Sequence, residues 1–428
     1  GGGTSSFGIF LQGKNVTNMY SYADDLFWTK GNHSLKIGTS FTRYQNNDFF
    51  DGWRDGRYTF GSLAKFLTGV PTEWRGKAPG ASSLRGSREW AIGFYIQDDL
   101  KLTPNVTVNL GMRYEFITDP YEINGIQYTL GPDPLNAAQP TNEPPFFKNP
   151  SKTNFAPRIG IAWDPLGDGT TSIRAGYGIF HDTILFYQFA NSMRRNCPIN
   201  STLVLRSGIT FPSPKPGLPP TNMKTCPTGR VGFQAFEFNV PQPYMQQWNF
   251  SIQRELFVGT SITAAYVGSK GTHLLGHRDI NTAEPIGTLN GAKFFGAPGT
   301  PNQPRRNPNF SNITYWDYGY DSNYHGLSFQ LRKRFAQGLQ FQGSYTWGKS
   351  LDTNTRGNSG DASGPASEPQ DTYNLSLNRG PSDHHVEHAF RFNWVYALPI
   401  SGLSGAAKVL LEGWQLQGIV SLNTGGPL

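Results

Sequence analysis

The segment EWAIGFYIQDDLKLTPNVTVNLGMRYEF, residues 89–116, decides the fold because its apolar side chains recur at every second position. The alternation runs from Trp90 to Ile96 and resumes from Val106 to Phe116 after a short turn. A period of two places alternate side chains on opposite faces of a strand. The segment therefore predicts an antiparallel hairpin with one apolar and one polar face.

Five other parts of the chain repeat this pattern of two alternating segments joined by a turn. They span residues 20–29 with 33–45, 155–163 with 171–180, 247–256 with 260–267, 327–335 with 339–347, and 388–398 with 414–422. Phe7–Gln12 resembles the remainder of a further strand. The sequence thus predicts an all-β chain of about 12–14 strands arranged as successive hairpins.

Short and long connections alternate between these strands. The long ones are rich in Gly, Pro, Asn and Ser and cover about residues 46–87, 119–154, 181–243, 271–322 and 349–385. Loops of this length are uncommon in compact soluble domains. Short periplasmic turns opposite long extracellular loops are typical of outer-membrane β-barrels, and strands of about ten residues fit their tilted span. One short helix is expected in the first long loop, at residues 61–70.

The composition excludes several other classes of protein. The chain has 428 residues, of which 14% are aromatic, 37% hydrophobic and 16% charged, with 50 glycines. No run approaches the ~18 to 20 apolar residues that a membrane-spanning helix needs. The net charge is +7, and its Lys and Arg residues are scattered rather than clustered, so no nucleic-acid partner is expected.

The two strand faces carry different kinds of side chain. The polar phase includes Arg113, Glu115, Gln253, Arg332 and Arg391, as expected of the wall of a water-filled lumen. The apolar phase has aromatic residues near strand ends, as in the interfacial girdles of membrane barrels. These residues are Trp28, Tyr114, Trp163, Trp248, Trp347, Trp394 and Trp414. The predicted partner of the apolar face is outer-membrane lipid, and the predicted location is the outer membrane of a Gram-negative bacterium.

Several motifs resemble a known family. They are YIQDDLKLTPN (residues 95–105) with VNLGMRYE (108–115), APRIGIAWDP (156–165), WNFSIQREL (248–256) and YTWGKS (345–350). Together they are similar to the barrel of Oar-like TonB-dependent receptors. The resemblance implies a barrel of about 22 strands enclosing a plug, energised by the TonB complex. Residues 1–428 are then expected to be part of the barrel of a longer protein, without its plug and N-terminal domain.

The function expected from this resemblance is TonB-dependent transport of a bulky solute such as a glycan or peptide, with the long loops capturing an unidentified extracellular ligand. A passive channel and a surface adhesin are the alternatives. Loop aromatics are candidate ligand contacts because flat rings bind sugars and peptides through apolar faces. The same rings can equally pack the loops together. They are Trp53, Tyr58, Trp74, Tyr315, Trp316, Tyr318 and Tyr320.

The remaining reactive side chains give weaker signals. Cys197 and Cys226 lie in one Pro-rich stretch and fit either a local disulfide or two unpaired thiols. His384 and His388 are four residues apart, but strand alternation separates them too far for an easy metal chelate. No nucleophile, base and acid stand out as a set. We therefore expect neither a metal, a cofactor nor an enzymatic activity.

Overall fold

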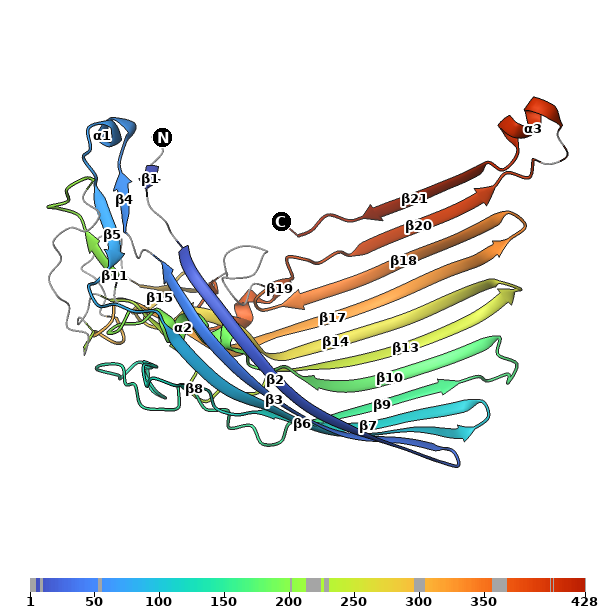
Figure 1. Ribbon diagram of the computed structural model, residues 1–428, viewed down its shortest axis with the longest axis horizontal. Helices are drawn as coiled ribbons and strands as arrows, with labels where there is room; N and C mark the ends of the chain where they lie inside the picture. The colour runs from blue at the N-terminus through green and yellow to red at the C-terminus, as the bar shows by residue number, and fades with distance from the viewer. Residues whose placement is uncertain are drawn as a thin grey trace.

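The computed structural model describes residues 5–7, 11–52, 56–200, 202–212, 225–226, 231–295, 305–355, 368–400, 402 and 404–427. Within these residues, twelve long strands form one continuous antiparallel path, and each strand pairs with its neighbours along the chain. Figure 1 shows them as a curved, open sheet with β2 and β21 at its two edges. The strands are β2 (Leu11–Lys30), β3 (His33–Gly52), β6 (Arg85–Thr103), β7 (Val106–Ile117), β9 (Phe155–Trp163), β10 (Thr171–His181), β13 (Tyr244–Phe257), β14 (Thr260–Asp279), β17 (Ile313–Ala336), β18 (Leu339–Asp352), β20 (His388–Ala397) and β21 (Gln415–Asn423).

All six predicted hairpins are present, and their short turns lie at one end of the sheet (Figure 1). The turn between β17 and β18 shows how the sequence sets them. Gln337 and Gly338 both have a positive φ, of 52° and 78°. Two successive residues with positive φ match the twist of a two-residue hairpin, and glycine adopts this conformation at little cost.

The strands are longer than the predicted length of about ten residues, so the predicted loop boundaries were wrong. β2 and β3 each have 20 residues, and β17 has 24. Their extra length lies at the end opposite the short turns (Figure 1), where polar residues such as Asn46 and Asp48 continue the β3 ladder. Apolar alternation marks only the part of a strand with one face against an apolar environment, while backbone pairing continues beyond it.

The predicted strand at Phe7–Gln12 is also corrected. Residues 8–10 lie outside the described residues, and Leu11 already belongs to β2. Ser5–Phe7 forms β1, which pairs with β4 (Arg57–Phe60) rather than with the large sheet. β1, β4, β5 (Glu73–Lys77) and β11 (Thr202–Leu205) make a separate small sheet. Ser5–Phe7 therefore belongs to the loop layer, whereas Leu11 and Gln12 belong to the large sheet.

The loop layer lies at the end of the sheet opposite the short turns (Figure 1). Its smaller elements are α1 (Leu63–Leu67), β8 (Tyr121–Glu122), α2 (Phe186–Arg194), β12 (Phe233–Phe236), β15 (Gly287–Leu289), β16 (Ala292–Phe294), η1 (Leu375–Asn378) and β19 (Gly380–Pro381). The predicted helix at residues 61–70 is therefore confirmed as α1, and it packs on β4 through the rings of Phe60 and Phe66. A further helix, α3 (Gly405–Leu411), occupies the β20–β21 connection, for which only a longer turn was expected.

Strand register sorts the side chains of the sheet onto two faces. Phe250, Tyr266, Leu327 and Trp347 lie opposite one another on four adjacent strands and form one apolar row. The next row, on the other face, consists of Ser251, Ala265, Ser328 and Thr346. The apolar face stays open: the exposed fraction is 45% for Phe250 and 54% for Trp347. An exposed apolar surface of this extent indicates a face that contacts an apolar surrounding.

The buried apolar clusters lie in the loop layer. One cluster contains Phe146, Phe147, Phe189, Phe236 and Trp316, which are at most 4% exposed. No helix among the described residues is long and apolar enough to cross a membrane. The buried apolar cores of the described residues thus belong to the loop layer.

Candidate functional site

The loop between β10 and β13 folds over the polar face of the large sheet. Arg194 at the end of α2 binds the carboxylate of Asp48 on β3, with an N–O distance of 2.6 Å. The carbonyl of Met193 accepts a hydrogen bond of 3.0 Å from the guanidinium of Arg85 on β6. Asp48 and Arg85 both belong to the polar phase of their strands. The loop therefore covers the polar face rather than extending away from it.

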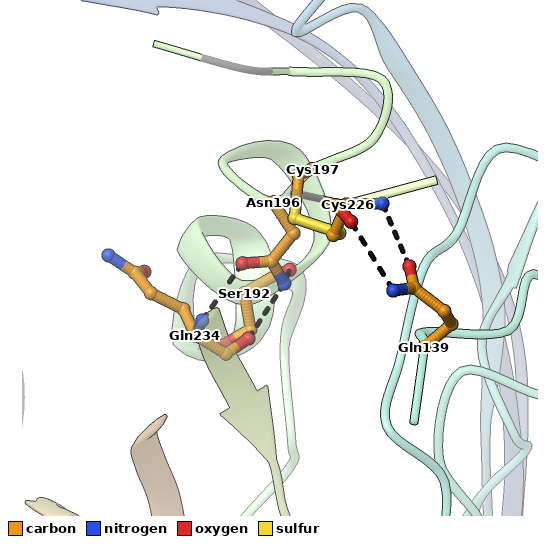
Figure 2. Close-up of a disulfide and its surroundings, with 6 residues drawn as sticks. All are labelled: Gln139, Ser192, Asn196, Cys197, Cys226 and Gln234. Atoms are coloured by element: carbon orange, nitrogen blue, oxygen red, sulfur yellow. Dashed lines mark hydrogen bonds between the residues drawn. A yellow bond between two sulfur atoms is a disulfide. The ribbon is translucent and has the colours of Figure 1, made fainter. Parts of the chain in front are cut away.

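A disulfide and two side-chain amides hold this loop together (Figure 2). Cys197 and Cys226 are bonded, with their Cα atoms 5.4 Å apart. The Gln139 side chain accepts from the Cys226 amide N–H at 2.8 Å and donates to the Cys226 carbonyl at 3.3 Å. Asn196 accepts from the Gln234 N–H at 2.9 Å and donates to the Gln234 carbonyl at 2.8 Å. These pairs satisfy buried backbone groups that irregular chain leaves open.

The structure does not bring the predicted ligand-contact aromatics to one surface. Trp53 lies outside the described residues. The other six are distributed over the loop layer, and five of them are at most 8% exposed. Those five are Tyr58, Trp74, Trp316, Tyr318 and Tyr320. Tyr315 is partly buried against a second loop cluster. Their placement suits the packing of loops, and their role in ligand contact stays a prediction.

A cavity of about 830 Å³ opens in the loop layer between the end of β14, the β15–β16 hairpin and residues 368–377. Its volume lies within the range of about 300–1,000 Å³ typical of ligand sites. The charged and aromatic residues of its wall are Arg278, Asp279, Lys293, Phe295, Glu368, Asp371 and Tyr373. Such a lining suits a polar ligand with a flat or ring-shaped part.

Tyr373 is held in a fixed orientation in this wall. Its hydroxyl donates to the carbonyls of Thr282 and Ala283, at 3.2 and 3.0 Å. The Lys293 ammonium lies 4.8 Å from the centroid of the Tyr373 ring and 2.6 Å from the Asp371 carboxylate. The hydrogen bond from Lys293 is the main cause that lowers the pKa of Asp371. The Tyr373 ring, the Lys293 ammonium and the Asp371 carboxylate therefore lie next to one another in the cavity wall.

Arg278 connects this cavity to buried carboxyl groups. Its guanidinium lies 2.7 Å from the Asp317 carboxylate and donates to the Thr372 carbonyl at 2.8 Å. Burial raises the pKa of Asp317, whereas the charge and hydrogen bond of Arg278 act to lower it. Glu237 accepts from the Tyr318 amide at 2.9 Å, and burial raises the pKa of Glu237 to about 7. Glu237, which changes charge near neutral pH, therefore lies close to the Arg278–Asp317 pair that borders the cavity wall.

The polar face of the strands carries charges that hold one another in place. Asp25 accepts a hydrogen bond from the Tyr95 hydroxyl and lies 3.1 Å from the Lys36 ammonium. Arg113 pairs with Glu115 on β7, and both were predicted to line the lumen. The Asp25–Lys36 pair lies toward the short turn of β2 and β3, whereas Arg113 and Glu115 lie near the loop end of β7. Both pairs keep this face hydrophilic.

A smaller cavity joins this polar face to the loop layer. Its volume is about 160 Å³, and it is lined by Arg113 and Glu115 together with Asp182 and Gln242 of the loops. Burial raises the pKa of Asp182, which lies just beyond the end of β10. Charged strand residues and loop residues therefore line one small cavity together.

Two of the three histidines at residues 384–388 form side-chain hydrogen bonds. Nδ1 of His388 lies 2.8 Å from the Tyr345 hydroxyl, and Nδ1 of His385 accepts from the Ser350 amide at 3.3 Å. Across the part of the chain that the structure describes, no three His, Cys, Asp or Glu residues are grouped to hold a metal ion.

Comparison with known proteins defines the class. The family described as "Outer membrane beta barrel domain" matches residues 1–428, and the chain therefore belongs to this family. The protein is located in the outer membrane of a Gram-negative bacterium, its apolar face contacts lipid, and its polar face lines the barrel interior. No curated protein matches the chain.

Two solved structures are similar to the chain at low sequence identity. The chain is similar to the outer membrane transporter YddB from Escherichia coli, with 11% identity and a TM-score of 0.50 over 90% of this chain and 40% of that one. It also matches the siderophore receptor PirA from Acinetobacter baumannii, with 12% identity and a TM-score of 0.46 over 90% of this chain and 41% of that one. The chain spans about two fifths of the length of these structures.

The sequence did not single out the residues of the loop cavity. Asp371 and Tyr373 lie in a polar stretch that reads as an ordinary turn. Lys293 reaches Asp371 across 78 residues, so no local pattern links them. Only the general expectation of long, functional loops pointed to this region.

Proposed function

We propose that residues 1–428 form barrel strands of an Oar-like TonB-dependent transporter for a bulky, polar solute. The plug and the contact with the TonB complex would be supplied by parts of the protein outside these residues. The loops bind the solute at the cell surface, and the polar face of the barrel gives it a hydrophilic route inward. The outer-membrane fold supports a transport role, because the barrel provides the route and the loops provide the specificity.

The observation that carries this proposal is the cavity of about 830 Å³ at residues 278–295 and 368–377. It combines the ring of Tyr373 with the charges of Lys293, Asp371 and Arg278. A ring stacks on flat apolar faces, while the charged groups hydrogen-bond hydroxyl or amide groups. A glycan or peptide has both kinds of surface, which is why we assign this ligand class.

The loop that folds inward at α2 favours a gated transporter over an open pore. Arg194 and Arg85 fix that loop onto the polar face through buried contacts. An inward-folded loop narrows the passage and places captured solute above the lumen.

The test is the behaviour of the intact protein purified from the outer membrane. In planar bilayers, a transporter closed by a plug gives almost no steady conductance, and its polypeptide is much heavier than 47.4 kDa. Solute uptake by cells should stop when the TonB complex is deleted. Steady conductance from a 47.4 kDa polypeptide would establish a passive channel instead. Absence of conductance, combined with solute uptake that continues without the TonB complex, would contradict the proposal as well.

A further inference from the structure

A third cavity, of about 470 Å³, lies between β14, β17 and β18. Its wall includes Tyr266, Leu327 and Trp347, which form the apolar register row on the lipid-contacting face. The cavity therefore opens on the outer wall of the barrel, away from the loop cavity and the barrel interior. A ligand of this cavity therefore enters it from the membrane.

Strand geometry places this cavity at the outer boundary of the hydrocarbon layer. Lys349 lines it and lies ten residues along β18 from Leu339 at the short-turn end. At ~3.4 Å per residue and a tilt of ~40°, those residues rise ~26 Å, compared with an apolar band of ~25 Å. His325 lies opposite Lys349 in register and is at the same level. The apolar side of the cavity thus faces acyl chains and its charged side faces headgroups.

The histidines of the charged side are held by defined hydrogen bonds. The Ser350 amide donates to Nδ1 of His385 at 3.3 Å, so the proton of the neutral ring is on Nε2. The Tyr266 hydroxyl bonds Nδ1 of His325 at 2.8 Å, and the two rings stack with their centroids 6.2 Å apart. The ring of Trp248 lies 5.9 Å from the same histidine. These contacts orient the rings without using the remaining N–H groups.

We propose that this cavity binds the phosphate-bearing headgroup of a membrane lipid. The Lys349 ammonium, which is exposed, and Nε2–H of His385 donate to the phosphate oxygens. Leu327 and Trp347 contact the upper part of an acyl chain. Glu387 also lines the cavity and is the one carboxylate among its described lining residues. This inference does not depend on the transported solute.

The experiment uses the intact protein in a neutral detergent with phosphatidylethanolamine added, and it counts retained lipid by native mass spectrometry. Lys349→Gln keeps the length and polarity of the side chain but removes the charge. Losing one charge-assisted hydrogen bond at an exposed site should reduce lipid retention about three- to tenfold. Lys270→Gln is the matched control, because Lys270 is exposed on the same face, next to β17, and does not line the cavity.

Two further arms distinguish a phospholipid site from a purely apolar groove and from a site for free phosphate. Diacylglycerol, which has no phosphate, should be retained no better by the unsubstituted protein than by Lys349→Gln. Millimolar inorganic phosphate should leave most of the lipid bound, because it makes no acyl contacts. Equal retention by Lys349→Gln and the unsubstituted protein, equal retention of diacylglycerol and phosphatidylethanolamine, or full displacement by inorganic phosphate would each overturn the proposal.

Discussion

Arg278 and Asp317 face each other across the β14–β17 pair, with the guanidinium 2.7 Å from the carboxylate. Arg278 also donates to the Thr372 carbonyl, so one side chain ties two strands to the segment that carries Tyr373. The Asp317 side chain is 5% exposed, whereas that of Arg278 is 24% exposed and reaches the loop cavity. The ion pair is therefore the link between the packed interior of the loops and the wall of the proposed binding site.

Asp317→Asn should loosen the cavity wall by leaving Arg278 half-buried without its counter-charge. Removing one partner of a well-buried pair costs ~3 to 5 kcal/mol, and the partial exposure of Arg278 reduces this to ~2 to 4 kcal/mol. Hydrogen exchange of residues 372–378 measures the change as faster local opening. The control is Asp321→Asn on the same strand, whose pair with Arg379 is exposed and should contribute less than ~1 kcal/mol. Equal effects of the two substitutions would contradict this prediction.

The loop layer should become easier to open as the pH rises from 5 to 8, through Glu237. Its pKa is about 7 in the folded state against 4.5 for the free side chain. The folded state therefore binds this proton more tightly, and the stability that Glu237 contributes is full below pH 4.5 and lost as the pH rises through 7. Asp317 shifts in the same direction, whereas the lowered pKa of His277 acts oppositely, at acidic pH.

The Glu237→Gln variant isolates this contribution, because glutamine keeps the shape and cannot ionise. Hydrogen exchange at the Tyr318 amide, which donates to Glu237, should be slower in the variant than in the unsubstituted protein at pH 8 and similar at pH 5. After allowance for solvent screening of a partly exposed group, the difference should be on the order of 1 kcal/mol. If the ratio of the Tyr318 exchange rates in the two proteins did not change with pH, this role of Glu237 would be ruled out.

Ala264→Arg should destabilise the barrel in lipid, because Ala264 shares the apolar phase of β14 with Tyr266. An arginine near the middle of the hydrocarbon layer costs ~2 to 4 kcal/mol. The neighbouring substitution Ala265→Arg places the same charge on the polar face and should cost less than ~1 kcal/mol. Urea unfolding from lipid bilayers compares the two free energies of unfolding. If Ala265→Arg lowered the free energy of unfolding more than Ala264→Arg, the assignment of the two strand faces to lipid and to the barrel interior would have to be reversed.

Replacing both cysteines, as Cys197→Ser with Cys226→Ser, should destabilise the loop over β3 and β6 without unfolding the strands. The disulfide closes a segment with a sequence separation of 29, for which loss of the cross-link costs ~3 to 4 kcal/mol. Limited proteolysis between residues 198 and 225 should be at least ~tenfold faster, since ~1.4 kcal/mol corresponds to a factor of ten. Reduction of the unsubstituted protein should reproduce the effect. An unchanged cleavage rate would show that Gln139 and Asn196 hold the loop unaided.

The hairpins could be predicted because strand alternation is a local signal. Residues such as Trp90 and Ile92 indicate the apolar face within a few positions. The turn at Gly338 needs backbone conformations that few residues other than glycine adopt. The extensions of β3 and β17 could not be predicted in this way. Their side chains pack against loop residues rather than lipid: Asn46 and Asp48 of β3 are buried polar groups, and Trp316, Tyr318 and Tyr320 of β17 are buried among the loops.

The loop aromatics show the limit of composition as a guide to function. Trp316 and Tyr320 looked like candidate ligand contacts, yet packing against distant segments buries them. Tyr373 had no distinguishing sequence feature and lies in the cavity wall. Exposure of a loop side chain depends on which other loops pack against it, and those partners are far away in the chain.

By itself, the sequence determined the all-β class, the six hairpins and the assignment of one strand face to lipid. These features follow from backbone hydrogen bonding and the two-residue period of a strand, both of which act between near neighbours. The tertiary structure alone decided the loop cavity, the contact of Gln139 with Cys226 and the pairing of Lys293 with Asp371. The last two contacts join residues 87 and 78 positions apart, and only the folded loops bring them together.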